Sequence, residues 1–168
     1  MTKEALMYSS DIYTFFYGGP FSQWYKSDFI SIAVDGKPIK FNCAEQYMMY
    51  SKASLFEDKE SAAKILRVSD PRTQKLYGRE VKGYNDDVWM KHAPNIVYNG
   101  NYLKFTQNER LLKALLETKG TLVEASPYDN RWGIGLSEDT AQKTDPSKWP
   151  GKNLLGQILT RLRKNLEN

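Results

Sequence analysis

An acid and a lysine lie seven residues apart in residues 42–53, a segment with the pattern of the opening turns of a helix. At 100° per residue, Glu45 and Lys52 fall on one face of that helix, with two methionines between them. A carboxylate and an amine can act as general acid, general base or nucleophile. We therefore expect this face to form the wall of a pocket in which chemistry takes place.

Structural roles are the alternative for both charged residues. Asn42 can cap the helix by accepting hydrogen bonds from the N–H groups of its first turn, and Glu45 can then reach back to the N–H of the cap. Lys52 can fix a phosphate or pair with Glu45. Burial beside Met48 or Met49 would instead lower the pKa of Lys52 enough for a nucleophilic role. The sequence leaves these alternatives open.

The single Cys and the single His exclude several kinds of site. An intramolecular disulfide is impossible, so a reducing cytoplasm is the expected location. Cys43 and His92 are too few for a protein zinc site, and we predict neither a metal nor a cofactor. A nucleophilic Cys43–His92 pair is less favoured than structural roles for both residues. Acid–base chemistry then falls to carboxylates, lysine or tyrosine.

Size and composition favour one domain and an anionic partner. A chain of 168 residues can bury its own core as a single unit. Aromatic residues make up 13 % of it, with 11 Tyr and 4 Trp, and the net charge is +4. Flat aromatic rings suit stacking on bases or sugars, and positive charge favours a nucleotide or nucleic acid. Because no window approaches transmembrane length, we expect no membrane association.

Local patterns predict the elements that position these residues. They are strands at 12–17, 28–34, 38–41 and 121–125, and helices at 42–56, 58–68, from 70, 85–105, 108–120 and 152–166. Asp58 and Asp70 are expected to cap helices, and Pro94 is expected to kink or divide the long one. Arg163 and its basic neighbours at the end of the last helix favour a solvated face over a phosphate contact.

A series of motifs runs through the chain in one order. They are Ala44-Glu45-Gln46-Tyr47-Met48-Met49 with Lys52-Ala53, then Gly78-Arg79, Trp89, Lys104-Phe105, Leu122-Val123-Glu124-Ala125-Ser126-Pro127, Asp129, Trp132-Gly133-Ile134-Gly135, and Asn153-Leu154-Leu155-Gly156. In this order they resemble the NADAR family, the YbiA-like N-glycosidases, over roughly residues 13–163.

The resemblance implies a compact, mostly helical α+β fold with a small sheet, as one domain over residues 1–168 with its core at roughly 13–163. It also implies hydrolysis of a ribosyl N-glycosidic bond. Members of the family remove ADP-ribose from guanine bases of nucleic acid or cleave ribosylamino-pyrimidine intermediates of riboflavin synthesis. The expected partner is a nucleotide-type substrate, which includes ADP-ribosylated DNA or RNA. The alternative is a module that binds ADP-ribose or nucleic acid without turnover.

The resemblance assigns catalysis to Glu45, Lys52 and Asp129. Cleavage passes through a positively charged sugar, so two carboxylates such as Glu45 and Asp129 can stabilise the sugar and protonate the departing base. Lys52 can instead attack the anomeric carbon of an opened ribose and form a Schiff base. For Asp129 the alternative is an Asx-turn in the loop formed by residues 126–135.

Substrate binding is assigned to Gln46, Arg79, Trp89, Trp132 and Phe21. Arg79 can grip a pyrophosphate, with a surface ion pair as the alternative. Trp132, in a Gly-flanked loop, is the better candidate for stacking on a base, because Trp89 falls on the apolar side of its helix. Phe21 can line a cavity, although packing against the core is the more common role for such a residue.

Overall fold

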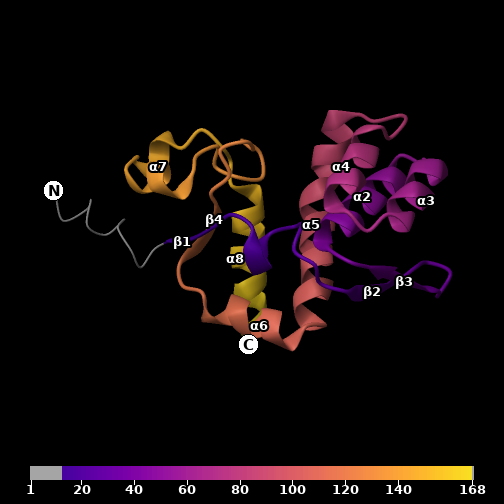
Figure 1. Ribbon diagram of the computed structural model, residues 1–168, viewed down its shortest axis with the longest axis horizontal. Coiled ribbons are helices and arrows are strands. Elements are labelled where there is room, and N and C mark those ends of the chain that lie inside the picture. The colour runs from indigo at the N-terminus through magenta and orange to yellow at the C-terminus, as the bar shows by residue number, and fades with distance from the viewer. Residues whose placement is uncertain (1–12, 168) are drawn as a thin grey trace. The chain divides into compact units, whose positions relative to one another are not determined.

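The structure, a computed structural model, describes residues 13–167 and divides the chain into two compact units (Figure 1). The central unit contains residues 23–112, and the terminal unit contains residues 13–22 and 113–167. Ile12, the first residue of the predicted N-terminal strand, lies outside the described residues. A single domain over the whole chain stays a prediction.

The central unit combines a β-hairpin with a group of helices. Strands β2 (Phe29–Ile32) and β3 (Pro38–Phe41) pair antiparallel, with Phe29 opposite Phe41. The helices are α2 (Ala44–Leu55), α3 (Lys59–Arg67), α4 (Pro71–Arg79) and α5 (Asp86–Thr106). These elements agree with the predicted ones, because alternation in the strands and polar caps on the helices are local signals.

Helix α2 is the centre of this unit, because α3, α4 and α5 all pack against it. Two glycines permit the close approach of the neighbouring helices. A Cβ atom at Gly78 of α4 would overlap the Met49 Sδ atom, and one at Gly100 of α5 would lie 2.6 Å from the Tyr47 Cδ1 atom. Helix α2 is therefore enclosed by its neighbours, and even charged side chains on it are buried.

The predicted cap of α2 by Asn42 is wrong. The N-cap is Cys43, and the Asn42 side chain instead donates to the Ser69 carbonyl over 2.8 Å and accepts from Gln74 Nε2 over 3.1 Å. The Asn42 N–H donates to Gln46 Oε1 over 2.8 Å, which is the contact expected of Glu45. The capping-box role therefore belongs to Gln46, and Glu45 is not needed for it.

The other predicted caps agree with the structure. Asp58 accepts from the Ser61 N–H and Asp70 from the Thr73 N–H. Hydrogen bonds from the Lys82 backbone and from Ser61 lower the pKa of Asp58 to about 2. Helix α5 runs unbroken from Asp86 to Thr106, so Pro94 does not divide it.

The terminal unit is built around a short parallel sheet. Strand β1 (Tyr13–Phe16) pairs with β4 (Thr121–Glu124), with Tyr13 opposite Thr121. Helix α8 (Leu154–Leu166) packs on β4, and α6 (Glu109–Glu117) carries the chain across the boundary between the units. The remaining elements are α7 (Glu138–Gln142) and the 3-10 turns η1 (Gly19–Phe21) and η2 (Pro146–Lys148).

The core of the terminal unit lies around β4 and the residues that follow it. Val123, Ala125, Ile134 and Ala141 are buried together there, and partly buried aromatic side chains such as Trp149 pack against them. The fold as a whole is mostly helical α+β, as predicted, and its strands form two separate two-stranded sheets among residues 13–167. Within the same residues, none of the helices is long and apolar enough to cross a membrane.

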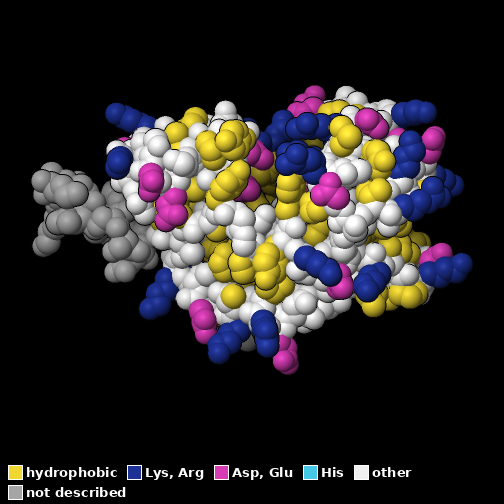
Figure 2. Space-filling view, viewed as in Figure 1, with side chains coloured by type: hydrophobic (Ala, Val, Ile, Leu, Met, Phe, Trp, Pro, Cys, Tyr) yellow, Lys and Arg dark blue, Asp and Glu magenta, His cyan; other side chains and the backbone are white. Residues whose placement is uncertain are grey.

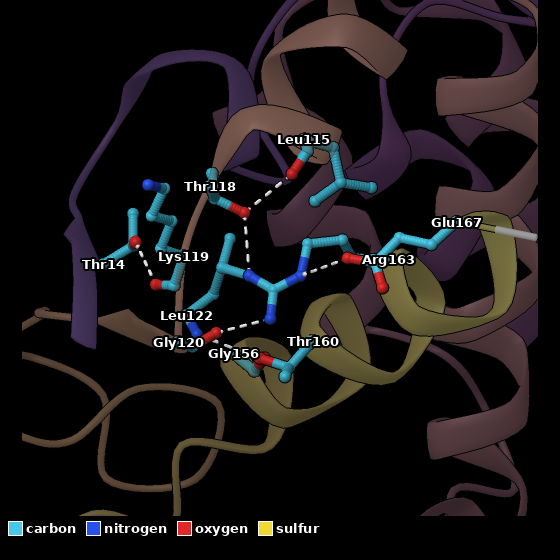
Figure 3. A network of polar contacts seen from close by, with 10 residues as sticks. All are labelled: Thr14, Leu115, Thr118, Lys119, Gly120, Leu122, Gly156, Thr160, Arg163 and Glu167. Carbon is cyan, nitrogen blue, oxygen red and sulfur yellow. Dashed lines mark hydrogen bonds and ion pairs between the residues drawn. The ribbon is translucent and has the colours of Figure 1, made fainter. Parts of the chain in front are cut away.

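Arg163 of α8 holds the chain between α6 and β4 (Figure 3). Its Nη1 donates to Thr118 Oγ1 over 2.9 Å, and its Nη2 donates to the Gly120 carbonyl over 2.6 Å. Its Nε lies 3.5 Å from Glu167 Oε1, and the residue is only 6 % exposed. The predicted solvated face is therefore wrong for Arg163, because protein oxygens replace water around its guanidinium group.

Candidate functional site

Glu45 and Lys52 lie at opposite ends of one buried face of α2. Glu45 is 6 % exposed in the first turn, and Lys52 is 9 % exposed in the last turn. Seven residues of helix place the two Cα atoms about 10 Å apart along the axis. Buried charged residues are rare unless they are paired or functional. The face predicted from the sequence to carry chemistry is thus the buried face of α2.

The amine of Lys52 lies against two aromatic rings. Its Nζ is 4.4 Å from the centroid of the Tyr84 ring and 5.7 Å from that of Trp89. Trp89 is 3 % exposed, whereas Tyr84 is 42 % exposed. The face of an aromatic ring attracts a cation, so the two rings fix the position of the Lys52 amine. Tyr84 is a part of this site that the sequence did not indicate, because it lies in the loop before α5.

Gln23 connects the first turn of α2 to α5. Its carbonyl accepts from the Glu45 N–H over 2.9 Å, and its side chain Oε1 accepts from Asn101 Nδ2 over 2.9 Å. Its Nε2 also lies 3.8 Å from Met48 Sδ. Asn101 is fully buried and donates in addition to the Val97 carbonyl. No local sequence pattern indicates this network, because Gln23 and Asn101 are 78 residues apart.

Lys104 is a second buried lysine of the central unit. It is 0 % exposed, and burial lowers its pKa to about 7. Its Nζ lies 4.9 Å from the ring centroid of Phe105 and 5.9 Å from that of Tyr25. Its spacing from Val97 and Asn101, the buried residues before it on α5, is the sequence signal that could have revealed its burial.

Cys43 is structural, as the sequence favoured. Burial raises the pKa of its thiol to about 11, and its Sγ donates to Gln74 Oε1 over 3.1 Å. A thiol that stays protonated at neutral pH is a poor nucleophile. His92 is exposed on α5. The Cys43 thiol is therefore not expected to act as a nucleophile.

Gln46 makes structural contacts through both ends of its amide, and binding of substrate by it stays a prediction. Its Oε1 accepts from the Asn42 N–H, and its Nε2 donates to the Ile65 and Val68 carbonyls over 3.0 and 3.2 Å. The side chain is 4 % exposed. Because its oxygen and both of its N–H donors are engaged by backbone groups, Gln46 ties α2 to the end of α3.

Arg79 and Trp89 lie in different surroundings. Arg79 is exposed in the last turn of α4, where it remains a candidate for a pyrophosphate contact. Trp89 is buried in α5 beside Lys52, which agrees with its apolar position on the helix. Its ring thus supports the lysine, and stacking on a base would require the ring to become exposed.

In the terminal unit, Asp129 organises the 126–135 loop. Its Oδ1 accepts from the Arg131 N–H over 2.9 Å and from the Trp132 N–H over 2.8 Å. This is the Asx-type turn that was the structural alternative for the residue. A catalytic role for Asp129 stays a prediction beside this structural one.

The 126–135 loop is held by the segment that leads into α8. The N–H groups of residues 151–155 donate to carbonyls of residues 130–134, with N···O distances of 2.7–3.2 Å. Asn153 adopts a left-handed backbone conformation with φ 53°, and its side chain bonds both the Glu124 N–H and the Leu122 carbonyl. A Cβ atom at Gly156 would overlap the Leu122 carbonyl oxygen. The motifs at 132–135 and 153–156 are therefore two halves of one interlocked structure.

Trp132 and Phe21 are both half-buried in the terminal unit. The ring of Phe21 packs edge-on against Phe16, with 5.8 Å between the centroids. Trp132 accepts through its carbonyl from the Leu155 N–H over 3.1 Å, so its backbone is fixed. Binding of substrate by these two rings stays a prediction.

Each unit brings together part of the predicted site. The central unit holds Glu45, Gln46, Lys52, Arg79 and Trp89, and the terminal unit holds the other three predicted residues. Among residues 13–167, no group of three or more His, Cys, Asp or Glu side chains could hold a metal ion.

Comparison with known proteins places the chain in a family of N-glycosidases. Residues 15–167 match the NADAR domain model, and the chain belongs to the NADAR domain family. It is 43 % identical over 164 residues to N-glycosidase R617 of Acanthamoeba polyphaga mimivirus, covering 92 % of this chain and 96 % of that protein. It is 37 % identical over 158 residues to Protein irg-1 of Caenorhabditis elegans, covering 87 % and 74 %.

A bacterial relative is similar in both sequence and structure. N-glycosidase YbiA of Escherichia coli is 30 % identical over 136 residues, covering 80 % of this chain and 75 % of that protein. The NMR structure of YbiA superposes with a TM-score of 0.71 at 28 % identity, covering 94 % of this chain and 86 % of that one. The resemblance inferred from the motifs, and the fold that it implied, are thus confirmed.

Proposed function

We propose that this chain, an N-glycosidase of the NADAR family, removes ADP-ribose from ADP-ribosylated guanine bases of nucleic acid. The observation that carries the proposal is the pair of charged side chains on the buried face of α2. Glu45 and Lys52 are the acid and the amine that the reaction needs, and both are held in place by tertiary contacts. Preorganised charges in a site that excludes water act more strongly than charges in solvent.

Glu45 is proposed to stabilise the sugar. As the bond between the anomeric carbon and the base nitrogen lengthens, positive charge grows on the sugar and negative charge on the base. A buried carboxylate beside the anomeric carbon would stabilise that charge, because the low local dielectric strengthens the attraction. The Gln23 carbonyl, which accepts from the Glu45 N–H, fixes the backbone that carries this carboxylate.

Lys52 is proposed to be the nucleophile. Its neutral amine would form a bond to the anomeric carbon as the bond from that carbon to the base breaks, and one amine proton would pass to the base, which leaves neutral. The C1′–O4′ bond of the ribose would then open, with the second amine proton passing to O4′, and a Schiff base between Lys52 and C1′ would remain. Water would then hydrolyse the resulting Schiff base, which releases ADP-ribose and restores the amine. Packing against the Tyr84 and Trp89 rings would keep the Lys52 side chain in position during these steps.

The remaining predicted residues are proposed to bind or to assist. Arg79, exposed at the end of α4, would pair with the pyrophosphate of ADP-ribose. Trp132 would stack on a base, with Phe21 as a second aromatic contact. Asp129 would supply a second carboxylate through the oxygen that does not hold the loop.

A ribosylamino-pyrimidine phosphate is the competing substrate, and binding without turnover is the competing function. Incubation of the protein with an oligonucleotide containing ADP-ribosylated guanine, and separately with the pyrimidine phosphate, distinguishes the three. We expect release of ADP-ribose from the first. Release of base from the pyrimidine phosphate alone would make that compound the substrate. Binding of either compound without release of any product would indicate a binding module.

Glu45→Gln tests the role of the acid in the same assay. We expect the release of ADP-ribose to fall at least about 100-fold, as is typical for the loss of an acid–base or charge-stabilising group. The melting temperature should stay near that of the parent chain, because Gln46 rather than Glu45 bonds the Asn42 N–H. A variant that loses stability but keeps its activity would contradict the assignment.

A further inference from the structure

The outer face of α4 carries cations beside an exposed tryptophan. Gln74 and Gly78 are buried against the rest of the central unit, which turns Arg72, Lys75 and Leu76 towards the opposite side of the helix. Arg72 is exposed, Lys75 is half-buried, and Leu76 is 51 % exposed. Arg79, the proposed pyrophosphate contact, falls on the same side of α4 one turn after Lys75, so this face continues from the proposed substrate contact.

The segment that contains this helix is rich in positive charge. Residues 59–82 contain seven Lys and Arg but three Asp and Glu, an excess of four that equals the net charge of +4 of the whole chain. Figure 2 shows Lys and Arg side chains gathered over the part of the molecule where Figure 1 places α3 and α4. Within this segment, Lys64 and Glu60 form an ion pair on exposed surface, with 3.8 Å between Nζ and Oε1.

Aromatic rings lie among these cations. The Lys75 Nζ is 5.9 Å from the centroid of the Trp24 ring, and Trp24 is 40 % exposed. On the other side of α4, the Lys64 Nζ lies 5.8 Å from the Tyr77 ring. Cations that neutralise phosphates next to exposed rings that stack on bases are the combination used to bind single-stranded nucleic acid.

We propose that Trp24, Arg72 and Lys75 form a strand-binding surface that holds single-stranded nucleic acid through its phosphates and one stacked base. The surface extends the proposed function, since it would hold a modified strand beyond the modified base. A strand of nucleic acid is the occupant that fits, because charge complementarity and an exposed ring occur together. An anionic membrane would be attracted by the same positive charges, but it has no base to stack on the exposed ring.

The test measures binding of an unmodified, fluorescein-labelled 12-nucleotide single strand by fluorescence anisotropy, from 50 to 200 mM salt. The double variant Arg72→Gln/Lys75→Gln should weaken binding and reduce the slope of log K against log salt by about 1.4, since each phosphate contact to a single strand contributes about 0.7. Trp24→Leu should weaken binding about tenfold, the size of one lost stacking contact.

Two controls separate this surface from general charge and from misfolding. Lys143→Gln/Lys148→Gln removes the same charge from exposed positions in the terminal unit and should leave the binding nearly unchanged. Arg72→Lys/Lys75→Arg keeps the charge and should bind as the parent chain does. Binding of vesicles that contain phosphatidylserine is measured in parallel and should be weak for every variant.

Equal weakening by the two Gln double variants would overturn the proposal, and so would strong vesicle binding that depends on Arg72 and Lys75. Because the strand is unmodified, the result does not depend on turnover. Failure of the proposed function would appear separately, as normal strand binding without release of ADP-ribose from a modified oligonucleotide. The proposed strand-binding surface would be supported if Arg72→Gln/Lys75→Gln lost binding of the strand but still released ADP-ribose normally from a single modified nucleotide.

Discussion

On the buried face of α2, Glu45 and Lys52 are charged side chains enclosed by neighbouring helices and rings, whereas in the 126–135 loop the Asp129 carboxylate accepts from two backbone N–H groups. Both regions carry motifs of the same family. In the first, tertiary contacts bury the charged side chains of the motif. In the second, the Asp129 side chain shapes the backbone of the loop. A motif of the family therefore places buried charged side chains in one unit and organises a loop in the other.

The largest effect expected from this difference is on Lys52. Lys52→Met should reduce the release of ADP-ribose at least about 1,000-fold, because a nucleophile cannot be replaced by an apolar side chain. Borohydride should trap a covalent adduct in the parent chain and not in the variant. Lys91→Met, which changes an exposed lysine of α5, is the matched control and should keep full activity and trapping. Full activity in Lys52→Met would remove the amine from the mechanism.

Two glycine substitutions compare the rigidity of the two regions. Gly156→Ala should lower the free energy of unfolding by about 3 kcal/mol, because its Cβ would overlap the Leu122 carbonyl oxygen, a backbone atom of strand β4 that cannot move as a side chain can. Gly78→Ala should cost less, about 1–2 kcal/mol, because Met49 is a flexible side chain that can move. Urea unfolding measures both. The reverse order would show that the α2 packing is the more rigid.

Lys104 gives the central unit a dependence on pH. Its pKa is about 7 in the folded chain, against about 10.4 when unfolded, so the folded state disfavours the charged amine. The penalty is complete below pH 7 and disappears as the pH rises towards 10. Between these values the parent chain should gain about 1.4 kcal/mol per pH unit relative to Lys104→Met. The same difference in free energy of unfolding between the parent chain and Lys104→Met at pH 6 and at pH 9 would contradict this prediction.

Two substitutions of Asp129 separate a catalytic role of its carboxylate from its structural role in the loop. Asp129→Ala removes the acceptor of two backbone N–H groups and should lower the free energy of unfolding by about 1–3 kcal/mol. Asp129→Asn keeps an acceptor oxygen and should unfold nearly as the parent chain does. Thermal melts and ADP-ribose release are measured together. Lost activity in the stable Asn variant would show that the carboxylate takes part in the reaction.

The elements of the fold could be predicted where their signals are local. The β2–β3 hairpin follows from Asp35-Gly36 between alternating strands, and Asp58, Asp70 and Asn85 cap the helices that they precede. Such signals lie within a few residues of the structure that they determine. The cap of α2 failed because Asn42 is drawn to Ser69 and Gln74 by tertiary packing.

Much of the candidate site could not be predicted, because its contacts join distant residues. The Gln23–Asn101 bond spans 78 residues, and Arg163 reaches Thr118 across 45. Periodicity indicated which face of α2 matters, but it could not show that Tyr84 would cover Lys52 or that Gln46 would be engaged by α3. Local patterns thus indicated the candidate residues of α2 and left their supporting partners unknown.

The position of Asn153 has a consequence for how the terminal unit behaves in a concentrated solution. Its amide group bonds the Leu122 carbonyl and the Glu124 N–H, while Thr160 accepts from the Leu122 N–H and Ile134 donates to the Glu124 carbonyl. These are the edge groups of β4 that another strand would pair with. Because side chains and loop already occupy them, β4 cannot template the addition of a strand from a second molecule, and this edge of the sheet is protected from aggregation.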